Sequence, residues 1–225
     1  MLLLADNSLV NNRDTIRAVS PLLALFPLDL VLFPSTPLPL HIFEPRYKEL
    51  IAECIESKMP FGVVKAKEDA LAEVGCTAHI TQVVKRYEDG RLDIVTEGVR
   101  RFEIAELNHD RAFVQAEVLF FEDTPNTLPS KEQREKAFEL HEALIDITGS
   151  EAAIPSRGKR EQDELLSFHL AHELPVDLDF KQTLLAMRSE AERITTLIDY
   201  YENILPKLRR VVRTREKAST NGHAM

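Results

Sequence analysis

The spacing of apolar residues changes once along the chain, and this change limits the folds that the chain can adopt. In residues 22–121 apolar and polar positions mostly alternate, as in β-strands, whereas in residues 130–209 apolar residues recur with the period of an α-helix. The segment EDTPNTLPS between them has the prolines, Asn and Ser of a connector. The sequence therefore predicts an α+β fold, with strands and helices segregated into two lobes.

The first half predicts a small β-barrel. Asp89-Gly90, flanked by β-branched runs, indicates a tight hairpin. Pro45 is expected to open a helix, because proline fits the first helical position. The apolar residues on one face of that helix are Tyr47, Leu50, Ile51 and Cys54. Strands are expected in the other apolar runs of this half, namely LALFPL, LVLF, FGVV, VRRFEIAEL and AFVQAEVLF.

The second half predicts a bundle of four helices. Ser130-x-x-Gln133 is a capping box for the first helix, and Asp179 or a neighbour is expected to cap the third. The last helix has the clearest apolar stripe, from Ile194 to Leu208. We therefore expect an N-terminal arm, a barrel lobe, a helical lobe and a basic C-terminal tail, at residues 1–20, 21–124, 125–209 and 210–225.

Residues 26–47, FPLDLVLFPSTPLPLHIFEPRY, combine closely spaced prolines with large apolar side chains. Pro27 and Pro34 are expected to keep strands short, because proline cannot donate a hydrogen bond to a β-ladder. Glu44 and Arg46, on either side of Pro45, are expected to pair where the segment turns into the helix. The segment therefore reads mainly as a corner of the scaffold. Its apolar side chains either pack in the core or line a peptide-binding groove, and these candidates are Leu38, Leu40, Ile42 and Phe43.

The composition argues against several classes of protein. The formal net charge is −9 at pH 7, which disfavours broad nucleic-acid binding, because the phosphate backbone needs a basic footprint. The exception is the basic run at 207–217, which is either the solvated end of a helix or a nucleic-acid arm. No apolar run approaches the ~20 residues that span a bilayer, and the N-terminus lacks the pattern of a signal peptide. Cysteines without a CxxC motif fit a reducing cytoplasm.

Motifs for catalysis, cofactors and metals are missing from the sequence. No GxGxxG, GxxxxGK[ST] or HExxH motif occurs. His169 and His172 are spaced to share a helix face but have no third ligand for zinc, and Ser156-x-x-Lys159 matches a nucleophile pattern without its companion motifs. Cys54 lies on an apolar helical stripe, so it is expected to be a core thiol. We therefore expect no catalytic residue, no cofactor and no metal.

The segment LFPLDLVLFPSTPLPLHIFEPRYKELI resembles the start of the N-terminal substrate-binding domain of Lon proteases. The similarity continues through FGVVKAKEDALAEVGCTAHITQVVKRYEDGRLDIVTEGVRRFEI, where Gly98, Arg101 and Phe102 match positions typical of the family, and reaches the last helix. It implies a small barrel of the PUA-like type followed by a helical bundle. Because the chain has no Walker motif and no Ser-Lys protease domain, we expect a stand-alone member without ATPase or protease activity.

The resemblance implies a non-catalytic protein that binds polypeptide or acts as an adaptor. Its expected partner is unfolded polypeptide or one specific protein, not a membrane, and homodimers are an expectation from the same family. RNA binding is the alternative, because barrels of this type occur in RNA-modifying proteins. Arg100, Arg101 and the basic tail would be the contacts, and the net charge counts against it. An enzyme of unknown type is a third alternative, which no assembled motif supports.

Overall fold

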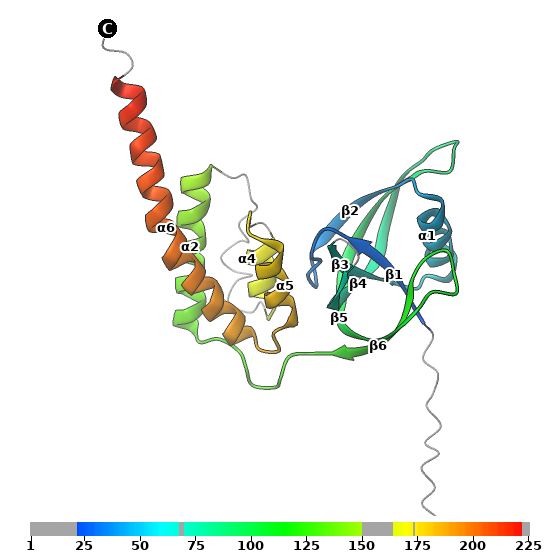
Figure 1. The fold of residues 1–225 in the computed structure, drawn as a ribbon. Helices are drawn as coiled ribbons and strands as arrows, with labels where there is room; N and C mark the ends of the chain where they lie inside the picture. The colour runs from blue at the N-terminus through cyan, green and yellow to red at the C-terminus, as the bar shows by residue number, and fades with distance from the viewer. Residues whose placement is uncertain (1–21, 68–69, 150–163, 173, 222–225) are drawn as a thin grey trace, which may run out of the picture.

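The chain folds into a barrel lobe and a helical lobe that lie side by side (Figure 1). The computed structural model describes residues 22–67, 70–149, 164–172 and 174–221. The barrel is N-terminal, and the connector after β6 leads into the helices. The predicted α+β fold is therefore confirmed. The predicted arm at 1–20, together with Ser156 and Lys159, lies outside the described residues.

Six strands form the barrel lobe. They are β1 (Leu23–Leu28), β2 (Pro37–Ile42), β3 (Phe61–Lys67), β4 (Ala70–Arg86), β5 (Leu92–Asn108) and β6 (Gln115–Phe121). Their order is β2-β5-β4-β3-β1-β6, and β6 pairs back with β5, so that a ring of strands closes. Residues 92–97 of β5 pair with β2, and residues 101–108 pair with β6. The predicted hairpin at Asp89-Gly90 joins β4 to β5.

Phe102 fills the interior of this ring. Its side chain is fully buried beside Leu25 and Ala116. Gly62 and Gly75 leave room for its ring, because a Cβ atom on either residue would lie only 2.8 or 2.5 Å from the Phe102 Cζ atom. Phe102 therefore belongs to the barrel core, which accounts for its aromatic side chain and for the glycines on the strands beside it.

The proline-rich segment differs from its prediction at its first strand. β1 continues through Pro27, which pairs in register with Val64 of β3. On the other side of β1, β6 pairs only near the start of the strand, at Leu23 and Ala24. The missing N–H of Pro27 therefore interrupts no ladder, and the proline does not end the strand.

Residues 30–33, predicted as a strand, are irregular. Leu32 and Phe33 are buried, and Pro34 beside them is buried too. The Phe33 ring stacks on Phe168 of the helical lobe, with 5.1 Å between the ring centroids. The run is apolar because it is enclosed between the two lobes, and not because it forms part of the sheet.

Among the residues that the structure describes, β2 pairs only with β5, and it therefore forms an edge of the sheet. The pairing runs without a break from Pro37 to Ile42. Pro37 and Pro39 have no backbone N–H, yet the ladder with β5 is unbroken at both residues. Their nitrogen atoms therefore lie on the free side of the strand, and that side has two fewer hydrogen-bond donors.

α1 (Pro45–Ser57) begins at the predicted proline and packs on the barrel. Its buried residues are the four predicted ones, Tyr47, Leu50, Ile51 and Cys54. Tyr47 stacks on Phe26 of β1 with 4.0 Å between ring centroids. Arg46 Nε donates to Glu44 Oε2 at 3.0 Å, which confirms the predicted pair at the helix start.

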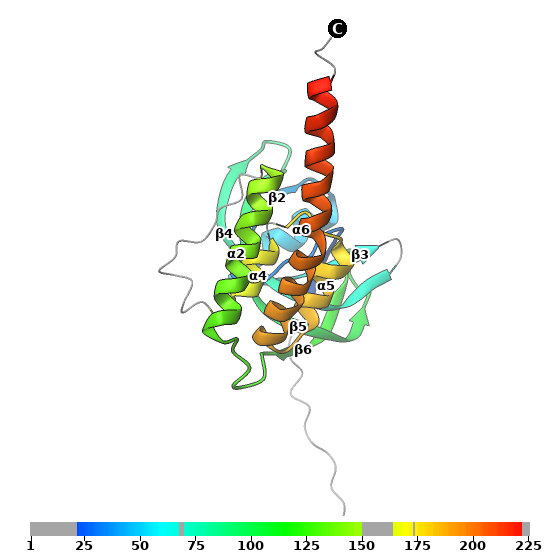
Figure 2. The same ribbon diagram turned by 90° about the vertical axis from the view of Figure 1, so that its left-hand side faces the viewer.

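The helical lobe contains α2 (Lys131–Thr148), α4 (Leu166–His172), α5 (Leu178–Ala186) and α6 (Glu190–Asn221). The capping box at Ser130 and Gln133 is confirmed. α5 is capped by Asp177, a neighbour of Asp179 as expected, and its side chain accepts a hydrogen bond from the N–H of Asp179. α6 lies along α2 (Figure 2), and His141 of α2 contacts the Tyr201 hydroxyl at 2.9 Å. α6 also continues through the predicted boundary at 209/210 and projects beyond the other helices (Figure 1).

We predict that Gly98→Ala lowers the free energy of unfolding by about 2 kcal/mol. A Cβ atom at Gly98 would lie 2.0 Å from the Phe33 carbonyl oxygen, which is backbone and cannot move aside easily. Urea unfolding followed by circular dichroism measures the change. Glu97→Ala, at the exposed neighbouring position, is the control and should change stability by less than about 0.5 kcal/mol. Equal stabilities of the two variants would contradict the close approach.

Candidate functional site

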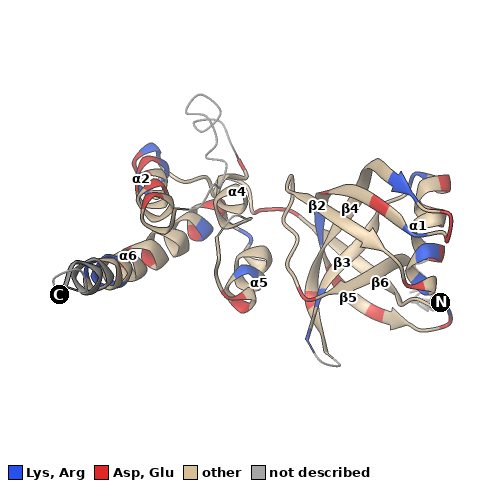
Figure 3. Cartoon of the chain, turned by 90° about the horizontal axis from the view of Figure 1, so that it is seen from above, with Lys and Arg blue, Asp and Glu red and all other residues tan. Residues whose placement is uncertain are grey.

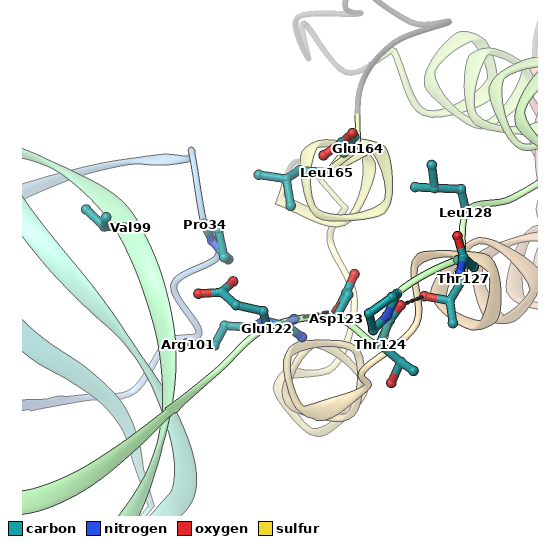
Figure 4. A pocket seen from close by; sticks show the side chains of 12 residues that line it. Pro34, Val99, Arg101, Glu122, Asp123, Thr124, Thr127, Leu128, Glu164 and Leu165 are labelled. Atoms are coloured by element: carbon teal, nitrogen blue, oxygen red, sulfur yellow. Dashed lines mark hydrogen bonds and ion pairs between the residues drawn. The ribbon is translucent and has the colours of Figure 1, made fainter.

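A cleft of about 380 Å³ lies between the two lobes (Figure 4). Its walls come from the turn after residues 30–33, from β5, from the connector after β6 and from the start of α4. The lining residues are Pro34, Val99, Arg101, Glu122, Asp123, Thr124, Pro125, Asn126, Thr127, Leu128, Glu164 and Leu165. Because these segments are far apart in sequence, the shape of the cleft depends on how the lobes are held together.

Arg193 of α6 is the centre of the contacts that hold the connector in place. Its side chain is 0% exposed, and its guanidinium donates to both carboxylate oxygens of Asp123, at 2.8 and 2.5 Å. It also donates to Glu190 at 2.6 Å and to the Ser167 hydroxyl at 2.8 Å. One side chain therefore ties the connector to α4 and α6 by charge-assisted hydrogen bonds.

Arg101 of β5 extends this network into the barrel. Its buried guanidinium donates to Asp123 Oδ1 at 2.5 Å. It also donates to the carbonyl oxygens of Leu185 and Met187, at 3.2 and 2.5 Å, between α5 and α6. Asp123 thus bridges two arginines, one from each lobe, and we call the group Arg101, Asp123, Glu190 and Arg193 the interlobe network.

Phe168 of α4 packs against both arginines of the interlobe network. Its ring centroid lies 4.2 Å from Arg193 Cζ and 5.3 Å from Arg101 Cζ. The ring is fully buried, so these cation–π contacts are shielded from water, which strengthens them. Together with the Phe33 stack, they fix the start of α4 against the barrel.

The two carboxylates of the interlobe network have opposite pKa shifts. Burial raises the pKa of Asp123, but the hydrogen bonds and charges of Arg193 and Arg101 outweigh burial, so that this pKa lies below its usual value. At Glu190 burial is the stronger effect and raises the pKa, although Arg193 and Ser167 lower it. The fold therefore stabilises the charge of Asp123, the residue in the connector.

Apolar side chains from both lobes are exposed at the cleft. Val99 of β5 is 49% exposed, and Leu128 of the connector is 56% exposed. Figure 4 shows Leu165, at the start of α4, directed across the opening towards Pro34 and Val99. Figure 3 shows the acidic stretch of the connector, in red, running between the lobes. The cleft therefore combines apolar walls with carboxylates.

The four residues predicted for a peptide-binding groove lie elsewhere, on β2 and just after it. Ile42 is 1% exposed, and Leu38 and Leu40 are half-buried and pack against the main core. Phe43 is 59% exposed and stacks on His41 with 6.0 Å between ring centroids. Peptide binding at these residues stays a prediction, with Phe43 as its exposed member.

The described residues contain no group of three or more side chains arranged to hold a metal ion, and this includes His169 and His172. Burial raises the pKa of the Cys54 thiol to about 11 and that of the Cys76 thiol to about 12. Both thiols are buried, so they are core residues rather than activated nucleophiles. None of the described helices is long and apolar enough to cross a membrane.

Residues 22–203 match the ATP-dependent protease La (LON) substrate-binding domain. The chain belongs to this family. The Lon protease of Cytophaga hutchinsonii is 24% identical over 192 residues, which are 80% of this chain and 24% of that protein. The Lon protease of Parabacteroides distasonis is 32% identical over 140 residues, which are 59% of this chain and 16% of that protein. The chain thus spans about a quarter or less of the length of these Lon proteases.

Solved structures of Lon N-terminal domains have the same architecture. The Lon N-terminal domain protein from Xanthomonas campestris has a TM-score of 0.64 and 26% identity, and the match covers 80% of this chain and 98% of that one. The N-terminal domain of Mycobacterium avium complex Lon protease has a TM-score of 0.52 with the same coverage. At 19% identity, the second comparison supports the fold alone. Membership of the Lon substrate-binding family, predicted from the sequence, is confirmed.

Most of the interlobe network was not predicted from the sequence. Resemblance to the family pointed to Arg101, but no pattern in the sequence assigned a role to Asp123, Glu190 or Arg193. One signal was present, because Glu190 lies four residues before Ile194 and therefore on the apolar stripe of the last helix. A charged residue on a buried stripe needs a buried partner, and Arg193 follows at the i+3 position.

We predict that Asp123→Asn lowers the free energy of unfolding by about 3 kcal/mol at pH 7, because it leaves two buried arginines short of a counter-charge. The native pKa of Asp123 is lowered, so its contribution is complete above its unfolded pKa of about 4 and is lost as the pH falls through the native value. The difference from the unsubstituted protein should therefore shrink below about pH 4. Urea unfolding at pH 7, 5 and 3.5 measures it.

Asp199→Asn on the exposed face of α6 is the matched control for this experiment. It should leave stability within about 0.5 kcal/mol at each pH. A loss of similar size in both variants, or a loss in Asp123→Asn that does not change with pH, would contradict the role of the Asp123 charge.

Proposed function

We propose that the protein binds polypeptide segments in the cleft between its lobes and does so without a catalytic step, as a polypeptide-binding or adaptor protein. The observation that carries the proposal is the exposure of Val99 and Leu128 on opposite sides of one cleft. Membership of a substrate-binding family supports it.

The cleft suits an unfolded polypeptide or a flexible segment of a partner protein. When a ligand covers large apolar side chains at a concave site, their removal from water stabilises the complex by about 25 cal/mol per Å² of buried apolar surface. Thr124, Pro125 and Asn126 are consecutive in the connector and line the cleft, so an extended segment can lie beside them. A folded protein presents few side chains that reach into such a cleft, so unfolded chains are the preferred ligand.

The connector is held firmly enough to act as a fixed wall. The Thr124 N–H donates to the Arg188 carbonyl, and the Ala191 N–H donates to the Thr127 carbonyl, both at 2.8 Å. With Asp123 in the interlobe network, the connector is bound to the helical lobe along its length. A wall that is fixed before binding lowers the conformational entropy lost on association.

We retain the cytoplasm as the expected compartment of the protein and a homodimer as its expected assembly.

We predict that Leu128→Asp and Val99→Asp each weaken binding of a permanently unfolded protein, such as a reduced and carboxymethylated chain, by about tenfold or more. Each change replaces an apolar contact with a charge that the ligand would have to desolvate. Fluorescence anisotropy with the labelled unfolded chain measures Kd. The folded form of the same protein should bind weakly, and RNA should not compete.

Leu119→Asp is the matched control, because Leu119 is 63% exposed on β6 and does not line the cleft. It should leave Kd unchanged, and circular dichroism should show the same fold in all three variants. Unchanged binding in both cleft variants, or an equal loss in Leu119→Asp, would show that the cleft is not the binding site.

A further inference from the structure

The charged side chains that line the cleft differ in whether other groups of the protein already neutralise them. The lining contains three carboxylates, Glu122, Asp123 and Glu164, and one cation, Arg101. Asp123 and Arg101 bind each other, and their remaining hydrogen bonds go to Arg193 and to main-chain carbonyls. A ligand in the cleft therefore meets the charges of Glu122 and Glu164.

Glu164 is exposed at the start of α4, next to Leu165 (Figure 4). Within the ranges that the structure describes, no Lys or Arg forms an ion pair with it. Glu122 lies across the cleft and pairs with Arg100 at 3.2 Å, where both side chains are exposed. An exposed pair of this kind contributes little free energy, so a cation from a ligand can replace Arg100 at small cost.

We propose that the cleft selects polypeptide segments in which Lys or Arg stands close to an apolar side chain. This preference rests on the proposed function and names the ligand class of the same site. Val99, Leu128 and Leu165 take the apolar side chain, and Glu164 and Glu122 take the cation.

The order of residues at the start of α4 fixes the spacing of this recognition. Glu164 and Leu165 are consecutive, so an apolar side chain placed against Leu165 brings neighbouring side chains of the ligand near Glu164. An extended segment rises about 3.3 Å per residue. The cation is therefore selected one or two residues from the apolar side chain, rather than at a distant position.

Acidic ligands are disfavoured by the same groups. A segment rich in Asp or Glu, or a nucleic acid, would bring negative charge close to Glu164 and to Glu122, whose ion pair with Arg100 is exposed to solvent. The net charge of −9 acts in the same direction at longer range, because it attracts cationic chains and repels anionic ones. A cationic and apolar segment is thus complementary to the cleft in both respects.

Three fluorescent peptides of the same length and with the same leucines, differing only in carrying Lys, Gln or Glu at two neighbouring positions, test this preference. Fluorescence anisotropy measures Kd in 0.15 M and 0.5 M NaCl. We expect the Lys peptide to bind about three- to tenfold more tightly than the Gln peptide, and the Glu peptide to bind most weakly. The differences should shrink in 0.5 M NaCl, because salt screens exposed charges.

The double variant with Glu122→Gln and Glu164→Gln should bring the Kd values of the Lys and Gln peptides close together, while Glu139→Gln, an exposed change on α2 outside the cleft, should keep them apart. If the three peptides bind equally and Leu128→Asp still weakens all of them, the charge preference is overturned and the proposed function stands. If the Lys preference persists when Glu122→Gln and Glu164→Gln are combined, the cation binds elsewhere and the proposal is overturned. If neither the peptides nor an unfolded protein binds, the proposed function itself is overturned.

Discussion

The buried contact between Arg193 and Asp123 is the constraint on which the arrangement of the lobes depends. A guanidinium with no solvent exposure is stable only when its charge and its donors are matched, and here Asp123, Glu190 and Ser167 provide that match. Asp123 also binds Arg101, so moving the connector away from the helical lobe would leave Arg193 and Arg101 without this counter-charge. One apolar cluster runs from the barrel into the helical lobe, where Phe33 stacks on Phe168, and together with the interlobe network it sets the relative position of the lobes and so the cleft between them.

Local signals in the sequence predicted the elements that are stabilised locally. The proline at the start of α1, the capping box at Ser130 and the turn at Asp89-Gly90 act within a few residues of chain, and the structure has all of them. Predictions from local sequence were wrong where a contact between residues far apart in the sequence determines the structure. Residues 30–33 are apolar like a strand, yet they are buried because Phe33 meets Phe168, which is far away in sequence. β1 continues through Pro27 because β6 pairs with β1 only near its start, so that no partner strand needs the missing N–H. The sequence of β1 alone does not show which strands lie beside it.

The candidate site was less predictable than the fold for the same reason. Val99 and Leu128 belong to different segments, and nothing in the residues around either one indicates that they face a common opening. The sequence pointed instead to a run of apolar residues on β2 and just after it, most of which pack against the core. Resemblance to Lon substrate-binding domains predicted the lobes and the class of function, but the position of the cleft followed only from the packing of one lobe on the other.

Pro37 and Pro39 on β2 bear on whether other chains can add to the open edge of the sheet. Unfolded polypeptide readily adds to any open strand that offers N–H donors, and growth by successive additions leads to fibrils. β2 is an edge, but its free side lacks two of the donors that a new strand would need. The same prolines that shape the corner before α1 thus make this edge a poor seed for aggregation.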